Sequence, residues 1–156
     1  MSMLEIGDSC PEFSLMQQDG KEVSLSDFKG KKILVFFYPR ANTSGCSKQA
    51  KAVSEAKQEL QEKYNCEVLG ISADTVRKQK NFEVKKELSI DLLSDEEHEV
   101  CEKFGVWQLK KMCGKEYMGI VRSSFLIDED GKVIQTWYKV KPDDTVPKAL
   151  EFLSSI

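Results

Sequence analysis

The sequence of 156 residues lacks any long apolar run, and no stretch approaches the roughly 18 uninterrupted apolar residues that a membrane-spanning helix requires. Residues 1–5 contain neither a basic cluster nor an apolar segment, so no secretory signal is visible and we expect a cytoplasmic protein. Excess positive charge is also absent. The net charge is −3 and is spread along the chain, which gives no reason to expect binding to nucleic acid or to an anionic membrane.

Metal-binding patterns are missing as well. There is no Cys-x-x-Cys, and the only histidine, His98, makes with Cys101 a single helical pair, short of the four ligands that structural zinc needs. The acidic residues 128–131 lack the rest of a calcium-binding loop. We therefore expect no metal and no other cofactor.

The five cysteines are odd in number and widely spaced, unlike the paired cysteines of a small secreted protein. Reduced thiols in a reducing compartment fit better. A lone cysteine is usually a small buried apolar residue, and we expect that role for three of them. These three are Cys10, Cys66 and Cys101, and the remaining two are Cys46 and Cys113.

The length and composition are those of one soluble domain. Apolar residues make up 40% of the chain and charged residues 31%, and 156 residues can bury a substantial core. No linker, repeat or low-complexity segment interrupts the sequence, so we expect residues 1–156 to form a single domain. A monomer is the default expectation, because no extra apolar face is evident.

The order of predicted elements indicates an α/β fold. Residues 33–38 are a continuous apolar run typical of a buried strand, and residues 46–64 have apolar side chains at helical spacing. Residues 68–72 are a second buried strand, which predicts a parallel strand, helix, strand unit with a right-handed crossover. The later elements are predicted as helices over 75–88, 96–104 and 146–153, a short strand at 92–93, and a hairpin over 124–138 with an Asp-Gly turn at 128–131. This order is typical of a thioredoxin-like fold, in which helices flank a central mixed sheet.

The chemistry centres on Cys46, which opens a helix just beyond the carboxyl end of the first buried strand. Free N–H groups and the positive end of the helix dipole favour the thiolate there. Ionisation alone gains only about thirtyfold over an ordinary thiol at pH 7, so an efficient reaction with a peroxide also needs donors aimed at the departing oxygen. Thr43 and the backbone N–H groups of Gly45 and Cys46 can supply donors, and an arginine should complete the set.

A resemblance to a known family implies roles for these residues. Pro39, Thr43 and Cys46 match the Pro-x-x-x-Thr-x-x-Cys motif of peroxiredoxins, and residues 37–50 resemble the peroxiredoxin Q branch, also called bacterioferritin comigratory protein. Similar segments extend over nearly the whole chain, at residues 7–15, 93–95, 104–107 and 119–128. The resemblance implies a thioredoxin-like domain of the AhpC/TSA type in which Cys46 is the peroxidatic nucleophile. It also implies that Thr43 and Arg122 bind the peroxide, and that Pro39 shields the thiol from water.

By this resemblance the protein is an antioxidant thiol peroxidase, and its substrates are hydrogen peroxide and alkyl hydroperoxides. Many members carry a resolving cysteine five residues after the peroxidatic one, but that position here is Lys51. The Cys46 sulfenic acid must therefore react with an external thiol from thioredoxin, glutaredoxin or glutathione, or with another cysteine of the chain. Cys113, in the flexible-looking residues 110–115, is the preferred internal candidate, and external reduction is favoured over it.

Other functions fit less well. A non-enzymatic thioredoxin-like binding or chaperone module is the alternative that the missing cysteine at position 51 slightly favours. A disulfide oxidoreductase is disfavoured because Thr43 stands where the first cysteine of a Cys-x-x-Cys would be. Cys-His hydrolytic chemistry is disfavoured because His98 lies in an acidic helix start typical of an exposed surface. Thr43 could also cap the helix, a role compatible with binding peroxide.

Overall fold

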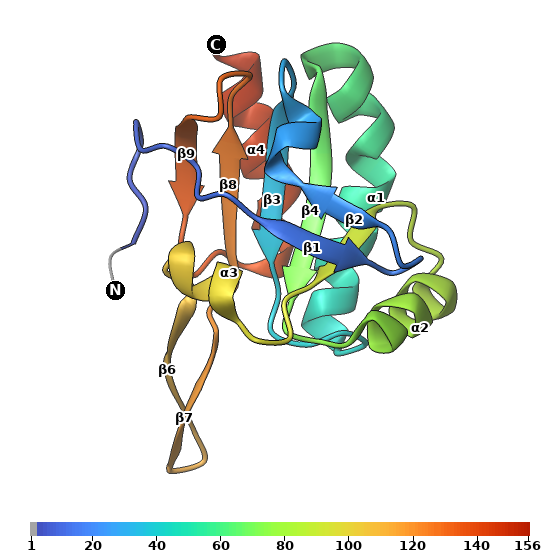
Figure 1. The fold of residues 1–156 in the computed structure, drawn as a ribbon, viewed down its shortest axis with the longest axis vertical. Coiled ribbons are helices and arrows are strands. Elements are labelled where there is room, and N and C mark those ends of the chain that lie inside the picture. Colours follow the sequence, from blue (N-terminus) through green and yellow to red (C-terminus); the bar gives the residue numbers. More distant parts are fainter. Residues whose placement is uncertain (1–2) are drawn as a thin grey trace.

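A computed structural model describes residues 3–156 and contains a seven-stranded mixed sheet with helices on both faces (Figure 1). In the order β2-β1-β5-β4-β3-β8-β9, its strands are β1 (Ser14–Gln17), β2 (Glu22–Ser24), β3 (Lys32–Phe37), β4 (Cys66–Ser72), β5 (Asp91–Ser94), β8 (Ser123–Ile127) and β9 (Val133–Trp137). A separate hairpin is formed by β6 (Trp107–Met112) and β7 (Lys115–Ile120). The helices are α1 (Ser44–Tyr64), α2 (Val76–Lys86), α3 (Glu99–Lys103) and α4 (Thr145–Ser154), with short 3-10 helices η1 (Leu25–Phe28) and η2 (Pro142–Asp144).

The centre of the sheet confirms the predicted strand, helix, strand unit. Strand β3 pairs in parallel with β4 and antiparallel with β8, and α1 connects β3 to β4. Both faces of these strands are covered, which explains their unbroken apolar runs. Within residues 3–156, no helix combines the length and apolar character needed to cross a membrane. The fold class predicted from the sequence, a thioredoxin-like α/β fold, is correct.

The core consists of two layers, one on each face of the sheet, because side chains alternate along a strand. On one face, Val35 and Phe37 of β3 pack with residues of α3 such as Val100. On the other face, Leu34 and Phe36 pack with α1 and α4. Each apolar side chain of β3 therefore belongs to one layer or the other.

The three cysteines expected to be buried are buried. Cys10 and Cys101 lie in the core layer on the α3 face of the sheet, Cys101 as part of α3 itself, and Cys66 lies in the opposite layer. Burial raises the pKa of Cys10 and of Cys66 to about 12, and it also raises the pKa of Cys101. Burial in the core keeps these three thiols in the neutral form.

The ends of the predicted elements lie within two residues of the observed ends, except at the start of α3. Helix α3 begins at Glu99 rather than at residue 96, because His98 adopts a left-handed conformation with a φ of 49°. The predicted hairpin is formed by β8 and β9, and residues 128–131 make its turn. Asp128 N donates to Lys132 O, and Gly131 alone has a positive φ, of 80°, which is the pattern of a type I turn closed by a glycine bulge.

The hairpin β6–β7 was not predicted, and residues 110–115, expected to be a flexible loop, lie within it. They form the end of β6, a tight turn and the start of β7. Cys113 and Gly114 have φ values of 52° and 79°, as a two-residue type I′ turn requires. Figure 1 shows the hairpin projecting from the body of the protein at the end of the sheet where the carboxyl ends of β3 and β4 lie.

Candidate active site

Cys46 lies in the first turn of α1 and is almost fully buried, with 1% of its surface exposed. The first hydrogen bond of the helix runs from Ser47 N to Thr43 O, over 2.8 Å. The N–H groups of Gly45 and Cys46 come before it and have no acceptor within the helix. The sequence thus places the sulfur at the end of the helix where free donors and the positive dipole favour negative charge.

Arg122, which is 76 residues away in the chain, contacts the sulfur directly. It immediately precedes β8, next to β3 in the sheet, and its Nη2 donates to Cys46 Sγ at 3.4 Å. Gly45 makes this approach possible, because a Cβ there would stand 3.1 Å from Nη2. A larger residue at position 45 would require the guanidinium to shift by a few tenths of an ångström.

The guanidinium of Arg122 is also hydrogen-bonded to Gln49. Arg122 Nη1 donates to Gln49 Oε1 at 2.7 Å, and Gln49 Nε2 donates to Thr145 Oγ1 at 2.8 Å. The side chains of Gln49 and Thr145 are completely buried, so water does not compete for these bonds. Gln49 was not among the site residues predicted from the sequence. In the structure it orients Arg122 toward Cys46.

Thr43 occupies the N-cap position of α1, but its side chain does not cap the helix. Its hydroxyl donates instead to Arg40 O at 2.9 Å. Because a hydroxyl has one hydrogen and two lone pairs, Thr43 Oγ1 can still accept a hydrogen bond. The side chain therefore presents an acceptor near the thiol.

Asp74 fixes the loop that leads to Cys46. Its Oδ2 accepts from Ala41 N and from Ser72 Oγ, both at 2.7 Å. Ser72 ends β4, so this carboxylate joins the loop after β3 to the neighbouring strand. No motif indicated Asp74, since its role depends on the pairing of β3 with β4.

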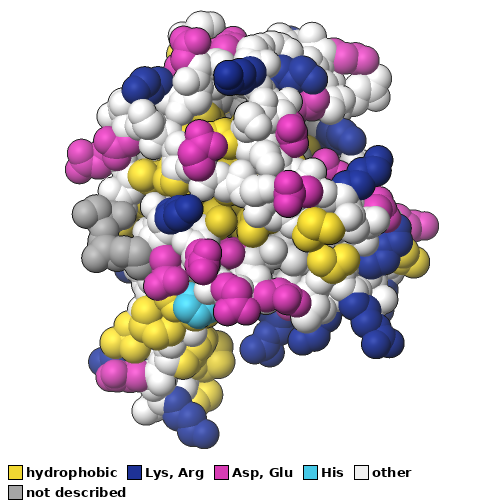
Figure 2. Space-filling view, in the orientation of Figure 1, with side chains coloured by type: hydrophobic (Ala, Val, Ile, Leu, Met, Phe, Trp, Pro, Cys, Tyr) yellow, Lys and Arg dark blue, Asp and Glu magenta, His cyan; other side chains and the backbone are white. Residues whose placement is uncertain are grey.

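A groove of about 700 Å³ brings the predicted site residues together and extends beneath the hairpin. Its lining includes Pro39, Thr43, Cys46 and Arg122 from the motif and the sheet. The hairpin and loop contribute the rest, which are Arg40, Ala73, Asp74, Trp107, Lys110, Met112, Tyr117, Met118, Gly119 and Ile120. Figure 2 shows apolar side chains gathered on the hairpin, and Leu109, Met112, Tyr117 and Met118 are exposed there. The site is thus open to a ligand and has one apolar wall.

The other cysteines are separated from Cys46. Cys10 and Cys101 lie on the opposite face of the sheet. Cys66 opens β4 beside Lys32, the first residue of β3, whereas Cys46 follows the last residue of that strand. Cys113 is exposed at the tip of the hairpin.

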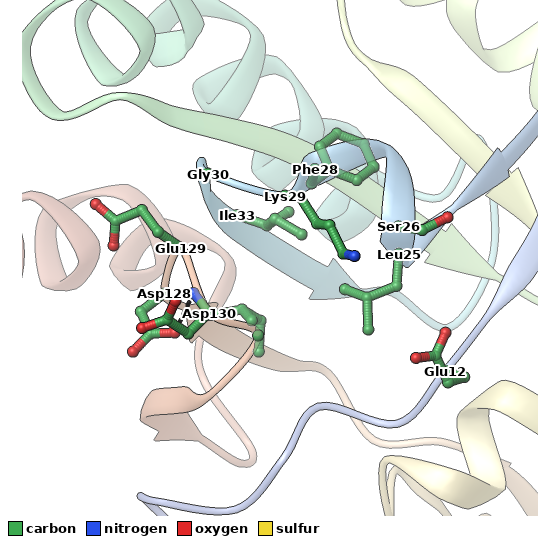
Figure 3. Close-up of a pocket in the computed structure, with 12 residues that line it drawn as sticks. Glu12, Leu25, Ser26, Phe28, Lys29, Gly30, Ile33, Asp128, Glu129 and Asp130 are labelled. Carbon is green, nitrogen blue, oxygen red and sulfur yellow. Dashed lines mark hydrogen bonds between the residues drawn. The ribbon is translucent and has the colours of Figure 1, made fainter.

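A second pocket, of about 470 Å³, lies at the other end of β3, between η1 and the turn that joins β8 to β9 (Figure 3). Its acidic side chains are Glu12 and those of the turn, where Asp128 Oδ1 accepts from the N–H groups of Asp130 and Lys132. It contains no nucleophilic thiol. Across residues 3–156, no group of three or more His, Cys, Asp and Glu side chains is placed to hold a metal ion.

Comparison with known proteins gives consistent matches. Residues 6–136 match the AhpC/TSA family. The chain is 46% identical over 156 residues to the putative peroxiredoxin bcp of Haemophilus influenzae, covering 100% of both chains. It is 51% identical to peroxiredoxin Bcp of Escherichia coli over 133 residues, 85% of each chain. A structure of the bacterioferritin comigratory protein of Xanthomonas campestris, studied for its alkyl peroxide reduction activity, superposes with a TM-score of 0.85 at 31% identity, covering 92% of this chain and 90% of the other.

Proposed function

Since this chain belongs to the AhpC/TSA family and is a peroxidase of the peroxiredoxin Q or Bcp type, we propose that its Cys46 thiolate reduces hydrogen peroxide and alkyl hydroperoxides and becomes a sulfenic acid. The observation that carries the proposal is the contact of 3.4 Å between Arg122 Nη2 and Cys46 Sγ, in a groove open to a small ligand. An alkyl chain on the peroxide finds an apolar wall in the exposed side chains of the hairpin.

In the proposed reaction, the O–H group of the peroxide donates a hydrogen bond to Thr43 Oγ1, whose own hydrogen is donated to Arg40 O. The sulfur attacks the nearer oxygen while negative charge develops on the farther one. Arg122 and the N–H groups of the first turn of α1 stabilise that charge, and such preorganised donors are worth about 10²–10³ in rate each. Pro39 lines the same groove and limits the access of water to the thiolate.

We further propose that an external thiol, from thioredoxin, glutaredoxin or glutathione, reduces the sulfenic acid. Cys10 and Cys101 lie across the sheet from Cys46, and Cys66 lies at its far end, so none reaches the sulfur without disrupting the core. The position five residues after Cys46 is Lys51. Cys113, at the hairpin tip, is the one internal alternative, since its neighbour Met112 lines the groove.

Steady-state consumption of peroxide in the presence of a thiol reductant tests this function. We expect Cys46→Ser to abolish turnover. Cys113→Ser makes the same substitution at an exposed cysteine, and we expect it to retain turnover. Turnover by the Cys46→Ser protein would refute the assignment of the nucleophile. Loss of turnover in Cys113→Ser would refute external reduction and make Cys113 the resolving cysteine.

A further inference from the structure

The side chain of Lys110 does not extend into solvent, although it belongs to a projecting hairpin. Its side chain runs back toward the body of the protein and crosses Gly119, where a Cβ would stand 3.2 Å from Lys110 Cδ. Its ammonium donates to the carbonyl of Ile120 at 2.9 Å. The glycine leaves room for the side chain, and the carbonyl fixes the charge at the base of the hairpin, two residues from Arg122.

This ammonium shares the groove with the reacting sulfur. Burial and the positive charge of Arg122 lower the pKa of Lys110, and the charge of Cys46 acts in the opposite direction. All three groups line one groove. Because an ammonium has three N–H donors and Ile120 accepts from one, two remain for a ligand.

The departing oxygen of the peroxide needs a proton, and the groups beside the sulfur are poor sources of one. The hydrogen of Thr43 is donated to Arg40 O, which orients the hydroxyl as an acceptor toward the groove. Arg122 binds negative charge but does not give up its proton. Lys110 lies in the same groove and can release a proton as its ammonium becomes an amine.

We propose that Lys110 donates a proton to the departing oxygen as the O–O bond breaks. This step rests on the proposed function of Cys46. The thiolate forms an S–O bond with the terminal oxygen, which keeps its hydrogen and becomes the sulfenic acid. The electron pair of the O–O bond passes to the other oxygen, which takes the proton of Lys110 Nζ and leaves as water or an alcohol. Solvent then protonates the amine again.

The step predicts a dependence on the leaving group. Hydrogen peroxide and tert-butyl hydroperoxide expel strongly basic oxygens that need a proton, whereas peracetic acid expels acetate, which leaves without one. In Lys110→Met we expect the rate of Cys46 oxidation to fall about 100-fold with the first two oxidants and by less than about threefold with peracetic acid. An equal loss with all three oxidants, or no loss, would overturn the proposal.

The chain provides a matched control. Lys111 points to the opposite face of the hairpin, is exposed and pairs with Glu116 at 3.6 Å. Lys111→Met removes the same charge one residue away and should leave the rates with all three oxidants unchanged. A loss in Lys111→Met that matches Lys110→Met would show a general effect of hairpin charge and overturn the assignment.

Two more variants separate proton donation from charge and from a neighbouring hydroxyl. Lys110→Arg keeps the positive charge but holds its proton, so it should show the same selective loss as Lys110→Met. Tyr117, opposite Lys110 in the hairpin, also lines the groove, and Tyr117→Phe removes only its hydroxyl, so any change in rate should be the same with all three oxidants. Normal rates in Lys110→Arg, or the selective loss in Tyr117→Phe, would refute Lys110 as the donor. If the wild type reacts with none of the oxidants at Cys46, the proposed function itself fails.

Discussion

Replacing Gln49 by leucine removes the amide that joins Arg122 to Thr145 while keeping a side chain of similar size. Two buried hydrogen bonds are lost, of 2.7 Å to the guanidinium and 2.8 Å to the threonine hydroxyl. A bond to a charged group is worth about 1.5–3 kcal/mol and a neutral one about 1 kcal/mol, so the free energy of unfolding should fall by about 2–4 kcal/mol.

The larger effect of Gln49→Leu should be on the reaction. Without its partner, the guanidinium no longer has a fixed direction toward Cys46 Sγ, and a misplacement of about 1 Å costs on the order of 100-fold in rate. The rate of Cys46 oxidation is measured by rapid mixing with peroxide, acid quenching and intact mass, and the stability by urea denaturation. The protein remains folded at low urea concentration, so the two losses can be measured separately.

Gln58→Leu is the matched control. Gln58 is on the same helix but exposed, and its amide donates to Glu62 at 3.1 Å. We expect its oxidation rate and its free energy of unfolding to stay close to those of the wild type. If Gln49→Leu also keeps an oxidation rate within about twofold of wild type, the guanidinium does not depend on Gln49 and the reasoning is refuted.

Three further predictions concern the core and the thiols. Gly70→Ala places a Cβ 2.8 Å from Phe36 Cζ in the middle of the sheet, so overpacking should lower the free energy of unfolding by about 1–3 kcal/mol in urea, and an unchanged midpoint would contradict the packing. Burial raises the pKa of Cys66 from 9.0 to about 12, so its stabilising contribution is complete below pH 9.0 and is lost as the pH rises toward 12. Between these values the free energy of unfolding of the wild type should fall about 1.4 kcal/mol per pH unit faster than that of Cys66→Ala, and equal slopes would show that the thiol titrates normally. In folded Cys46→Ser, a maleimide followed by mass spectrometry should label Cys113 alone, because the other thiols are buried, and a second label would contradict that burial.

Much of the fold follows from local patterns. The buried runs of β3 and β4 and the helical spacing of α1 depend on residues close in sequence, so they were predicted within a few residues. The hairpin β6–β7 was missed because it projects into solvent and its side chains, such as Leu109 and Tyr117, are exposed on both faces. The usual alternation of apolar and polar residues is therefore absent, and only the Cys113-Gly114 pair in a tight turn could have indicated it.

The site was predicted as far as its motif extends. Thr43, Gly45 and Cys46 lie within four consecutive residues, and the resemblance supplied Arg122, which the structure places against the sulfur. The roles of Gln49 and Lys110 could not be predicted, because the first depends on bonds to residues 73 and 96 positions away and the second on a hairpin that had not been foreseen. Long-range pairing, rather than local composition, decides which polar side chains surround the thiol.

The most direct test of the central claim is the mass of the protein and of its peptides after one equivalent of hydrogen peroxide, with dimedone present to trap sulfenic acid, in the wild type and in Cys113→Ser. We predict a single dimedone adduct on the peptide that contains Cys46 in both proteins, because Cys10, Cys66 and Cys101 are held in the core and the proposed reductant is an external thiol. A loss of about two mass units in the wild type, with the adduct only in Cys113→Ser, would instead identify an internal disulfide with Cys113. The absence of any reaction at Cys46 would contradict the central claim.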